Sequence, residues 1–142
     1  MQAVPLSRVR LATMTRCRAS ATMWPVRPTV LIVDDHEAFR EAALSLLTAE
    51  GFLVVGEAAH GTEALAAVDR LHPDVVLLDI QLPGLDGFDV ADQLAQRPDA
   101  PAVVLISSRD AATYGNRLHA APARGFLAKR DLSGAALAQL LA

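Results

Sequence analysis

Residues 75–87, Val-Val-Leu-Leu-Asp-Ile-Gln-Leu-Pro-Gly-Leu-Asp-Gly, decide the fold of this chain. The first four are aliphatic without any polar alternation, which is typical of a central parallel strand that is buried on both faces. Asp79 ends this apolar run, and two turn signals, Pro83-Gly84 and Asp86-Gly87, follow before a helical pattern begins. The stretch therefore predicts a buried strand that carries one carboxylate to the edge of a sheet.

Apolar runs of strand length alternate with segments of helical period on both sides of this stretch. The predicted strands are 29–33, 53–55, 75–78, 103–106 and 125–128. Helical patterns follow each of them, the first ended by Gly51, then 61–71, a third after Gly87, a fourth near 110–121 and a fifth over 133–141. Five such pairs predict an α/β domain, in which right-handed crossovers wind helices onto both faces of a five-stranded parallel sheet.

Polar residues follow four of the five predicted strands. They are Asp34, Asp35, Asp79, Ser107 and Lys129. The carboxyl ends of parallel strands meet at one edge of an open sheet, and ligands bind beyond that edge. We therefore expect these five side chains to lie together.

Three carboxylates at one edge repel one another unless a cation is supplied. Oxygen ligands favour a hard octahedral ion, so the sequence predicts Mg²⁺, with Mn²⁺ as a substitute. If Asp79 carried a phosphoryl group, Mg²⁺ could bind one of its oxygens. The Lys129 ammonium and the Ser107 hydroxyl could hold the other phosphoryl oxygens. The set is suited to an aspartyl phosphate on Asp79.

Three motifs identify a family. Residues 33–36 (Val-Asp-Asp-His), 78–87 and 126–129 (Phe-Leu-Ala-Lys) closely resemble the receiver domains of response regulators in two-component signalling. The resemblance covers the chain from Thr29 to its end. It implies a flavodoxin-like doubly wound fold with strand order 2-1-3-4-5.

The resemblance also implies roles for individual residues. Asp79 would be phosphorylated by a sensor histidine kinase, and Mg²⁺ would be held by Asp35, Asp79 and the Gln81 backbone carbonyl, with Asp34 acting mainly through water. Ser107 would turn toward the phosphoryl group, and Phe126 would be the switch aromatic that rotates inward with it.

The implied output surface is the fourth helix, the fifth strand and the fifth helix, which would contact a downstream protein partner or form a phosphorylation-dependent dimer. The chain departs from the family pattern at Arg130, where many members have proline. It also has Ala-Pro-Ala at 121–123 in place of a glycine-containing turn. Both departures concern the output surface and not the phosphoacceptor.

Simpler interpretations exist for each residue. Asp34 and Asp35 could cap the first helix, Asp79 could merely end a strand, Phe126 could be plain core, and Lys129 could be a solvated surface charge. The complete spacing of the set favours the metal and phosphoacceptor interpretation. The four histidines have no ligand spacing and receive no catalytic role.

Three other functions compete with a stand-alone phosphoacceptor module that is not an enzyme. The chain could be the receiver part of a regulator with a helix-turn-helix DNA-binding domain. An aspartyl-phosphate phosphatase of the haloacid dehalogenase type needs an Asp-x-Asp pair, and Gln81 stands where the second aspartate belongs. A non-phosphorylated docking module would usually lack part of the acidic cluster.

Composition limits the remaining possibilities. The net charge of −3 provides no global basic field for direct nucleic-acid binding, and no apolar stretch is long enough for a membrane span. The single cysteine, Cys17, favours a reducing cytoplasm. Residues 1–28 contain five arginines and no acidic residue, which predicts a poorly ordered basic extension or translation from Met23. We expect residues 29–142 to form one receiver domain without an output domain.

Overall fold

A five-stranded parallel sheet forms the centre of the molecule in a computed structural model that describes residues 27–142. The order across the sheet is β3-β2-β4-β5-β6, which is 2-1-3-4-5 in chain order and confirms the predicted fold. The strands are β2 (Thr29–Val33), β3 (Leu53–Ala58), β4 (Val75–Asp79), β5 (Ala102–Ser107) and β6 (Gly125–Ala128).

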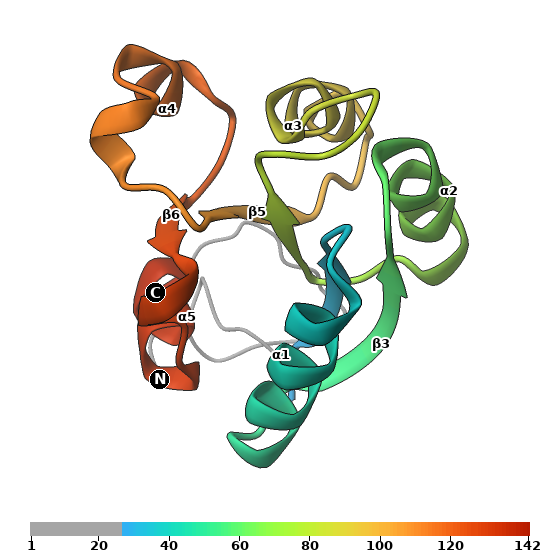
Figure 1. Ribbon diagram of the computed structural model, residues 1–142. Helices are drawn as coiled ribbons and strands as arrows, with labels where there is room; N and C mark the ends of the chain where they lie inside the picture. Colours follow the sequence, from blue (N-terminus) through green and yellow to red (C-terminus); the bar gives the residue numbers. More distant parts are fainter. Residues whose placement is uncertain (1–26) are drawn as a thin grey trace.

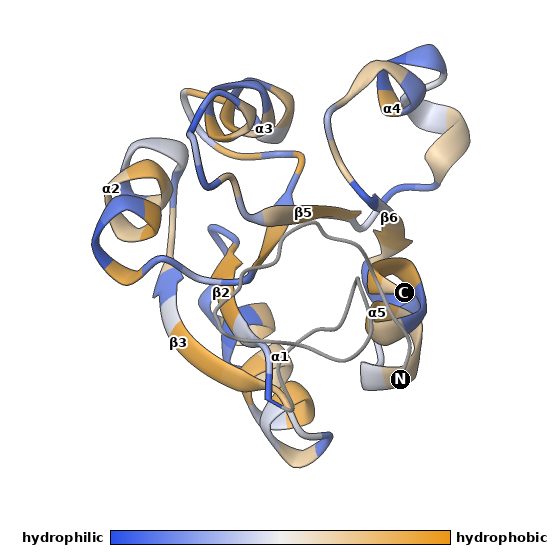
Figure 2. Ribbon diagram, turned by 180° about the vertical axis from the view of Figure 1, so that it is seen from behind, coloured by the Kyte–Doolittle hydropathy of each residue, from blue (hydrophilic) through white to orange (hydrophobic). Residues whose placement is uncertain are grey.

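Helices cover both faces of the sheet (Figure 1). One face carries α1 (Glu37–Ala49) and α5 (Gly134–Leu141), and the other carries α2 (Gly61–Leu71), α3 (Gly87–Ala95) and α4 (Asn116–Ala120). Figure 2 shows hydrophobic residues concentrated along the strands and helices of mixed hydropathy around them. This three-layer arrangement is expected when amphipathic helices bury one stripe against a sheet.

Strand β4 connects the two halves of the core. All five of its residues are buried, and their side chains alternate between the layers, with Val76 and Leu78 facing the α2 and α3 side and Val75 and Leu77 facing the α1 and α5 side. The strand pairs with β2 on one side and β5 on the other. Asp79, its last residue, therefore lies at the carboxyl edge of the sheet between two neighbouring strand ends.

The turn after β4 is fixed by close packing and by capping. Asp86 and Asp89 form a reciprocal capping box at the start of α3, which satisfies two backbone N–H groups. Gly87, the first helical residue, lies against the backbone of Asp79 and Ile80, and a Cβ atom there would lie 2.6 Å from the Ile80 Cα. The helix can approach the end of β4 this closely because residue 87 has no side chain.

Two predicted elements differ from the structure. The fourth helix, predicted near 110–121, is instead a 3-10 turn at Ala111–Thr113 followed by the five-residue α4. Gly115 has φ +56°, a left-handed conformation that interrupts the helix between them. The second strand extends to Ala58, beyond the predicted 53–55, because its last residues pair with the end of β2 after a register shift.

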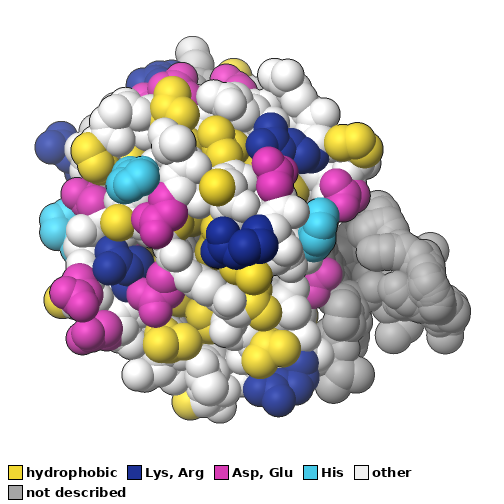
Figure 3. All heavy atoms as spheres, turned by 90° about the vertical axis from the view of Figure 1, so that its right-hand side faces the viewer, with side chains coloured by type: hydrophobic (Ala, Val, Ile, Leu, Met, Phe, Trp, Pro, Cys, Tyr) yellow, Lys and Arg dark blue, Asp and Glu magenta, His cyan; other side chains and the backbone are white. Residues whose placement is uncertain are grey.

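Surface charges of both signs are interspersed on the face that Figure 3 shows, the side of α2 and β3. Within residues 27–142, no helix has the length and apolar character needed to cross a membrane. The predicted basic extension, except for its last two residues, lies outside the described residues.

Gly87→Ala should destabilise the fold by about 2 to 3 kcal/mol, because its Cβ would meet backbone atoms that cannot move aside without distorting β4. Urea denaturation followed by circular dichroism measures this loss. The control is Gly56→Ala, whose Cβ would meet the end of the flexible Leu71 side chain at 2.8 Å. An equal loss in both variants would contradict the proposed close packing.

Candidate functional site

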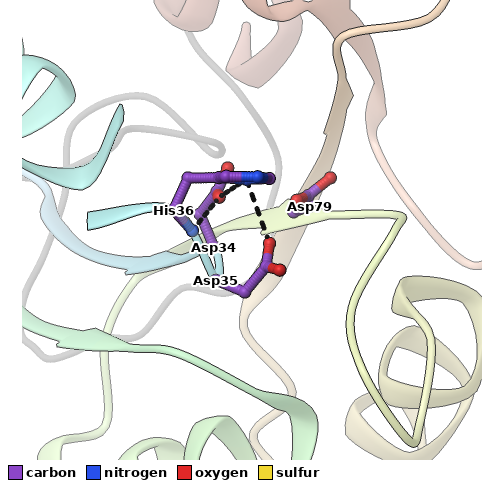
Figure 4. A group of neighbouring side chains, drawn as sticks. All are labelled: Asp34, Asp35, His36 and Asp79. Carbon is purple, nitrogen blue, oxygen red and sulfur yellow. Dashed lines mark hydrogen bonds and ion pairs between the residues drawn. The ribbon is translucent and has the colours of Figure 1, made fainter. Parts of the chain in front are cut away.

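Three carboxylates and an imidazole form a cluster at the carboxyl edge of the sheet (Figure 4). Asp34, Asp35 and His36 lie on the loop after β2, and Asp79 ends β4. One ligand atom from each lies within 4.8 Å of the others. Asp34 is 0% exposed and Asp79 is 2% exposed, whereas Asp35 and His36 face solvent. The cluster therefore has a dry inner side and a wet outer side.

Asp34 is held rigidly by its own loop. Its Oδ1 accepts a hydrogen bond from the His36 backbone N–H at 2.8 Å, and its backbone carbonyl accepts one from Arg40 at 2.7 Å. Its other oxygen, Oδ2, is buried and has an ion pair with the Lys129 Nζ at 2.5 Å but no partner in hydrogen-bonding geometry. A buried carboxylate oxygen of this kind can accept a further electropositive ligand.

The surroundings of Asp79 disfavour the ionised form of its carboxylate. Its Oδ1 accepts a hydrogen bond from the Gln81 backbone N–H at 3.1 Å, and its Oδ2 lies 3.4 Å from the Lys129 Nζ. Burial, and secondarily the neighbouring Asp34 charge, raise the pKa of Asp79 to about 6, although Lys129 and the Gln81 N–H oppose the shift. In the metal-free protein, the positive groups therefore only partly compensate the Asp79 charge.

Lys129 supplies the positive charge within the cluster. It follows β6 directly, its side chain is 15% exposed, and its ammonium lies 4.6 Å from the centre of the Phe39 ring. The aromatic face and the two buried carboxylates hold the ammonium by cation–π and ionic attraction. Lys129 is thus brought to the site as predicted.

The donor set fits a hard divalent cation. Two buried carboxylates, Asp34 and Asp79, share one ammonium, and the solvent-facing Asp35 lies beside them, which leaves an excess of negative charge. The Asp34 Oδ2 also lacks a hydrogen bond. Carboxylate and water oxygens are the ligands that Mg²⁺ prefers. The cluster is therefore suited to bind Mg²⁺.

His36 was assigned no role from the sequence, yet its ring borders the cluster. The ring Nδ1 lies 3.3 Å from the Asp34 Oδ1 and 3.1 Å from the Asp35 Oδ1, and the side chain is 71% exposed. Its position immediately after two strand-end aspartates was the available signal. The ring lies at the outer, solvated side of the site.

Ser107 ends β5 and is fully buried. With Ser107, all five predicted strand-end residues lie at the same edge of the sheet. Its hydroxyl lies 2.6 Å from the Tyr114 hydroxyl and accepts a hydrogen bond from the Arg109 N–H at 3.0 Å. Tyr114 was not singled out from the sequence. Its ring packs against Phe126, with the ring centres 6.3 Å apart.

A surface hollow of about 810 Å³ lies at the opposite, amino-terminal edge of the sheet. Its charged residues largely pair with one another, as in the double hydrogen bond between Arg97 and Asp69 and the ion pair between His72 and Asp99. It contains none of the strand-end residues described above. We therefore place the chemistry at the carboxyl edge and not in this hollow.

Comparison with known proteins identifies the family. A family model described as response regulator receiver domain matches residues 30–141. The DNA-binding transcriptional activator EvgA of Escherichia coli K12 is 30% identical over 101 residues, which cover 71% of this chain and 50% of EvgA. The positive alginate biosynthesis regulatory protein of Pseudomonas aeruginosa is 46% identical over 83 residues, which cover 57% of this chain and 34% of that protein.

Solved structures agree with this result. The signal receiver domain of NarL from Mycobacterium tuberculosis superposes with a TM-score of 0.71 at 34% identity, over 82% of this chain and 98% of that one. A chain of the CheX–CheY–BeF3–Mg²⁺ complex from Borrelia burgdorferi gives 0.69 at 28% identity, over 79% and 84%.

Fold, site and comparisons together define a phosphorelay signalling module. The chain belongs to the response-regulator receiver domain family of two-component systems, which confirms the resemblance seen in its motifs. It spans about half the length, or less, of the curated relatives that it matches.

Asp79→Asn should stabilise the metal-free protein at neutral pH by up to about 3 kcal/mol, because folding raises the pKa of Asp79 from 3.8 to about 6. The wild type loses stability relative to Asp79→Asn as the pH rises through these values. The free energies of unfolding of the two proteins should therefore become equal as the pH falls to about 4. Urea denaturation in EDTA across this range measures the difference. Asp92→Asn, which removes an exposed carboxylate from α3, is the control. If the free energies of unfolding of wild type and Asp79→Asn changed in parallel with pH, the raised pKa of Asp79 would be refuted.

Proposed function

We propose that Asp79 accepts a phosphoryl group from a sensor histidine kinase in a Mg²⁺-dependent reaction, and that the modification changes a protein-binding surface. The observation that carries this proposal is the position of Asp79. It is a buried carboxylate at the end of the central strand, with a second carboxylate and a lysine beside it. Such a set can activate an oxygen nucleophile and then neutralise the phosphoryl group that it receives.

The proposed transfer exchanges the phosphorus–nitrogen bond of a kinase phosphohistidine for a phosphorus–oxygen bond to Asp79, and the histidine nitrogen keeps the electron pair of the broken bond. An ionised oxygen of Asp79 attacks phosphorus, an oxygen–phosphorus bond forms, and the bond from phosphorus to the histidine nitrogen of the kinase breaks. Lys129 lies 3.4 Å from the Asp79 Oδ2 before the reaction and can pair with a phosphoryl oxygen after it. Without the metal, Asp79 has a pKa of about 6 and is mostly ionised at neutral pH. A bound cation would favour the ionised form further, so Asp79 is available as the oxygen nucleophile.

The chain offers a coherent set of ligands for the metal. Asp35, Asp79 and the Gln81 carbonyl would hold Mg²⁺ directly, and Asp34 would hold it mainly through water. Mn²⁺ could substitute. When bound, the ion would neutralise charge on the phosphoryl oxygens during transfer.

The proposed output surface consists of α4, β6 and α5. Phosphorylation adds about −1.5 to −2 charges and strong acceptor oxygens beside Ser107, from which the chain leads into the 3-10 turn and α4. A downstream protein or a second copy of the chain could recognise the altered surface. The module would act by binding and not by substrate turnover.

A second candidate is supported by the relatives. EvgA is a DNA-binding transcriptional activator, and this chain matches half of its length. The chain could therefore act as the receiver part of a longer DNA-binding regulator, in which the same surface would contact an attached domain. Both candidates share the phosphoacceptor chemistry and differ in what the surface contacts.

Acetyl phosphate and Mg²⁺ should convert the wild type into an acid-stable, base-labile phosphoprotein, because the product is a mixed anhydride on Asp79. Phosphate-affinity electrophoresis with intact-mass analysis measures the conversion. Asp79→Asn should show no conversion, while Asp92→Asn, which changes an exposed carboxylate on α3, should match the wild type. Equal labelling of Asp79→Asn would disprove the assignment.

Mg²⁺ should stabilise the wild type by about 1.4 kcal/mol at ten times its dissociation constant, since it binds the folded cluster and not the unfolded chain. Denaturation with increasing Mg²⁺ measures this effect. Asp35→Asn should reduce it by removing a solvent-facing ligand, and Asp92→Asn should leave it unchanged. A Mg²⁺ effect that survives Asp35→Asn would place the ion elsewhere.

A further inference from the structure

We infer that Tyr114 is a positioning residue that holds the Ser107 hydroxyl in the unphosphorylated state and must release it when Asp79 is modified. The inference rests on the proposed function of Asp79 and Ser107. It assigns the controlling contact to a tyrosine in the segment between β5 and α4, in addition to the aromatic residue Phe126 in β6. The central observation is the hydrogen bond of 2.6 Å between the Ser107 and Tyr114 hydroxyls.

The hydrogen-bonding capacity of Ser107 makes this contact consequential. A serine hydroxyl has one hydrogen and two acceptor positions, and the Arg109 N–H already occupies one acceptor position. Phosphoryl oxygens only accept hydrogen bonds, so Ser107 must donate its single hydrogen to one of them. If Ser107 donates to Tyr114, that bond must break. If Tyr114 is the donor, it fills the last acceptor position and holds the oxygen where it lies.

The burial of Ser107 strengthens its hydrogen bond to Tyr114. Ser107 is 0% exposed, so a hydroxyl that leaves Tyr114 cannot find a replacement partner in bulk water. Among the described residues, the hydrogen-bond partners of the hydroxyl are Tyr114 and Arg109, which both lie on the chain after β5. Neither partner is Asp79, so the bond to Tyr114 competes with any contact that Ser107 makes to a phosphoryl group.

Tyr114 is also a half-buried anchor of its own segment. Residues 109–113 and 115–117 are exposed, whereas the Tyr114 ring packs edge-on against Phe88, with ring centres 5.8 Å apart, and against Phe126. Gly115, with its positive φ, follows directly and separates Tyr114 from the short α4. Release of Tyr114 would therefore free the segment that enters the proposed output surface.

The energetic consequence is measurable. A neutral hydrogen bond contributes about 1 kcal/mol net, which corresponds to about a fivefold change in an equilibrium constant. Tyr114→Phe removes the hydroxyl and keeps the ring between Phe88 and Phe126. It should therefore favour the state in which Ser107 is free to turn, without removing the aromatic packing.

The test uses the beryllium trifluoride anion, which becomes tetrahedral and similar in shape to a bound phosphoryl group when a carboxylate oxygen coordinates it. The anion is titrated in saturating Mg²⁺, and its binding is followed by calorimetry. Tyr114→Phe should bind it about fivefold more tightly than the wild type. In the Ser107→Ala background, the same substitution should have no effect, because the hydroxyl that Tyr114 holds is absent. Urea denaturation of every variant confirms that it is folded.

The possible results distinguish failure of the Tyr114 contact from failure of the phosphoacceptor site. Unchanged or weaker binding by Tyr114→Phe would overturn the inference, and so would equal tightening with and without Ser107, since Tyr114 would then act through other contacts. Absence of binding by the wild type and all folded variants would refute the proposed phosphoacceptor site itself, and with it the inference.

A second measurement reports on the tyrosine directly. Tyr114 is the single tyrosine of the chain, so ¹³C-tyrosine labelling gives one ring environment in the NMR spectrum. Saturation with the same anion and Mg²⁺ should shift this signal in the wild type. A signal that stays in place while calorimetry shows binding would contradict release of Tyr114.

Discussion

Mutual repulsion of carboxylates at the end of a buried strand is the constraint on which the rest of this structure depends. Asp34 and Asp79 are almost fully buried at adjacent strand ends, and one ammonium, that of Lys129, lies between them. Burial of like charges is costly unless opposite charge is supplied. Burial and the Asp34 charge raise the pKa of Asp79 although Lys129 opposes the shift, so the ammonium compensates the carboxylates only in part. The site is therefore suited to bind a cation and to accept an electrophilic phosphoryl group.

The fold serves this site by holding its members on different strands. Asp34, Asp79, Ser107 and Lys129 belong to or follow four strands that are neighbours in the sheet. A parallel sheet brings their carboxyl ends together without any need for long loops. Gly87 lets α3 pack against the end of β4, which fixes the backbone beside Asp79. Reactive groups are thus held by the packed core, whereas the segment after Ser107 has few buried anchors.

Much of this arrangement could be predicted from the sequence because parallel sheets follow simple rules. The apolar run that ends in Asp79, together with strand and helix periodicity, was enough to predict the five strands and the meeting of five polar residues. The order of the strands followed from the resemblance to receiver domains and is confirmed by the structure. The roles assigned to those residues, including Gln81 and Phe126, stay predictions.

Local sequence patterns did not predict the contacts between residues that are distant in the fold. The predicted extent of the fourth helix was wrong, because hydrophobic periodicity does not reveal that a glycine adopts a positive φ. Gly115 does so and interrupts the predicted helix. The extension of β3 depends on its register with β2. Tyr114 meets Ser107 only through tertiary packing, since no local pattern distinguishes a tyrosine that binds a strand-end serine from an ordinary half-buried aromatic residue.

The most direct test of the central claim is to locate the modification chemically. Borohydride reduces an acyl phosphate on aspartate to homoserine, which peptide mass spectrometry can assign to one residue. After treatment with a phosphodonor and Mg²⁺, we expect homoserine at position 79. Homoserine at position 34 or 35 with none at position 79 would contradict the account.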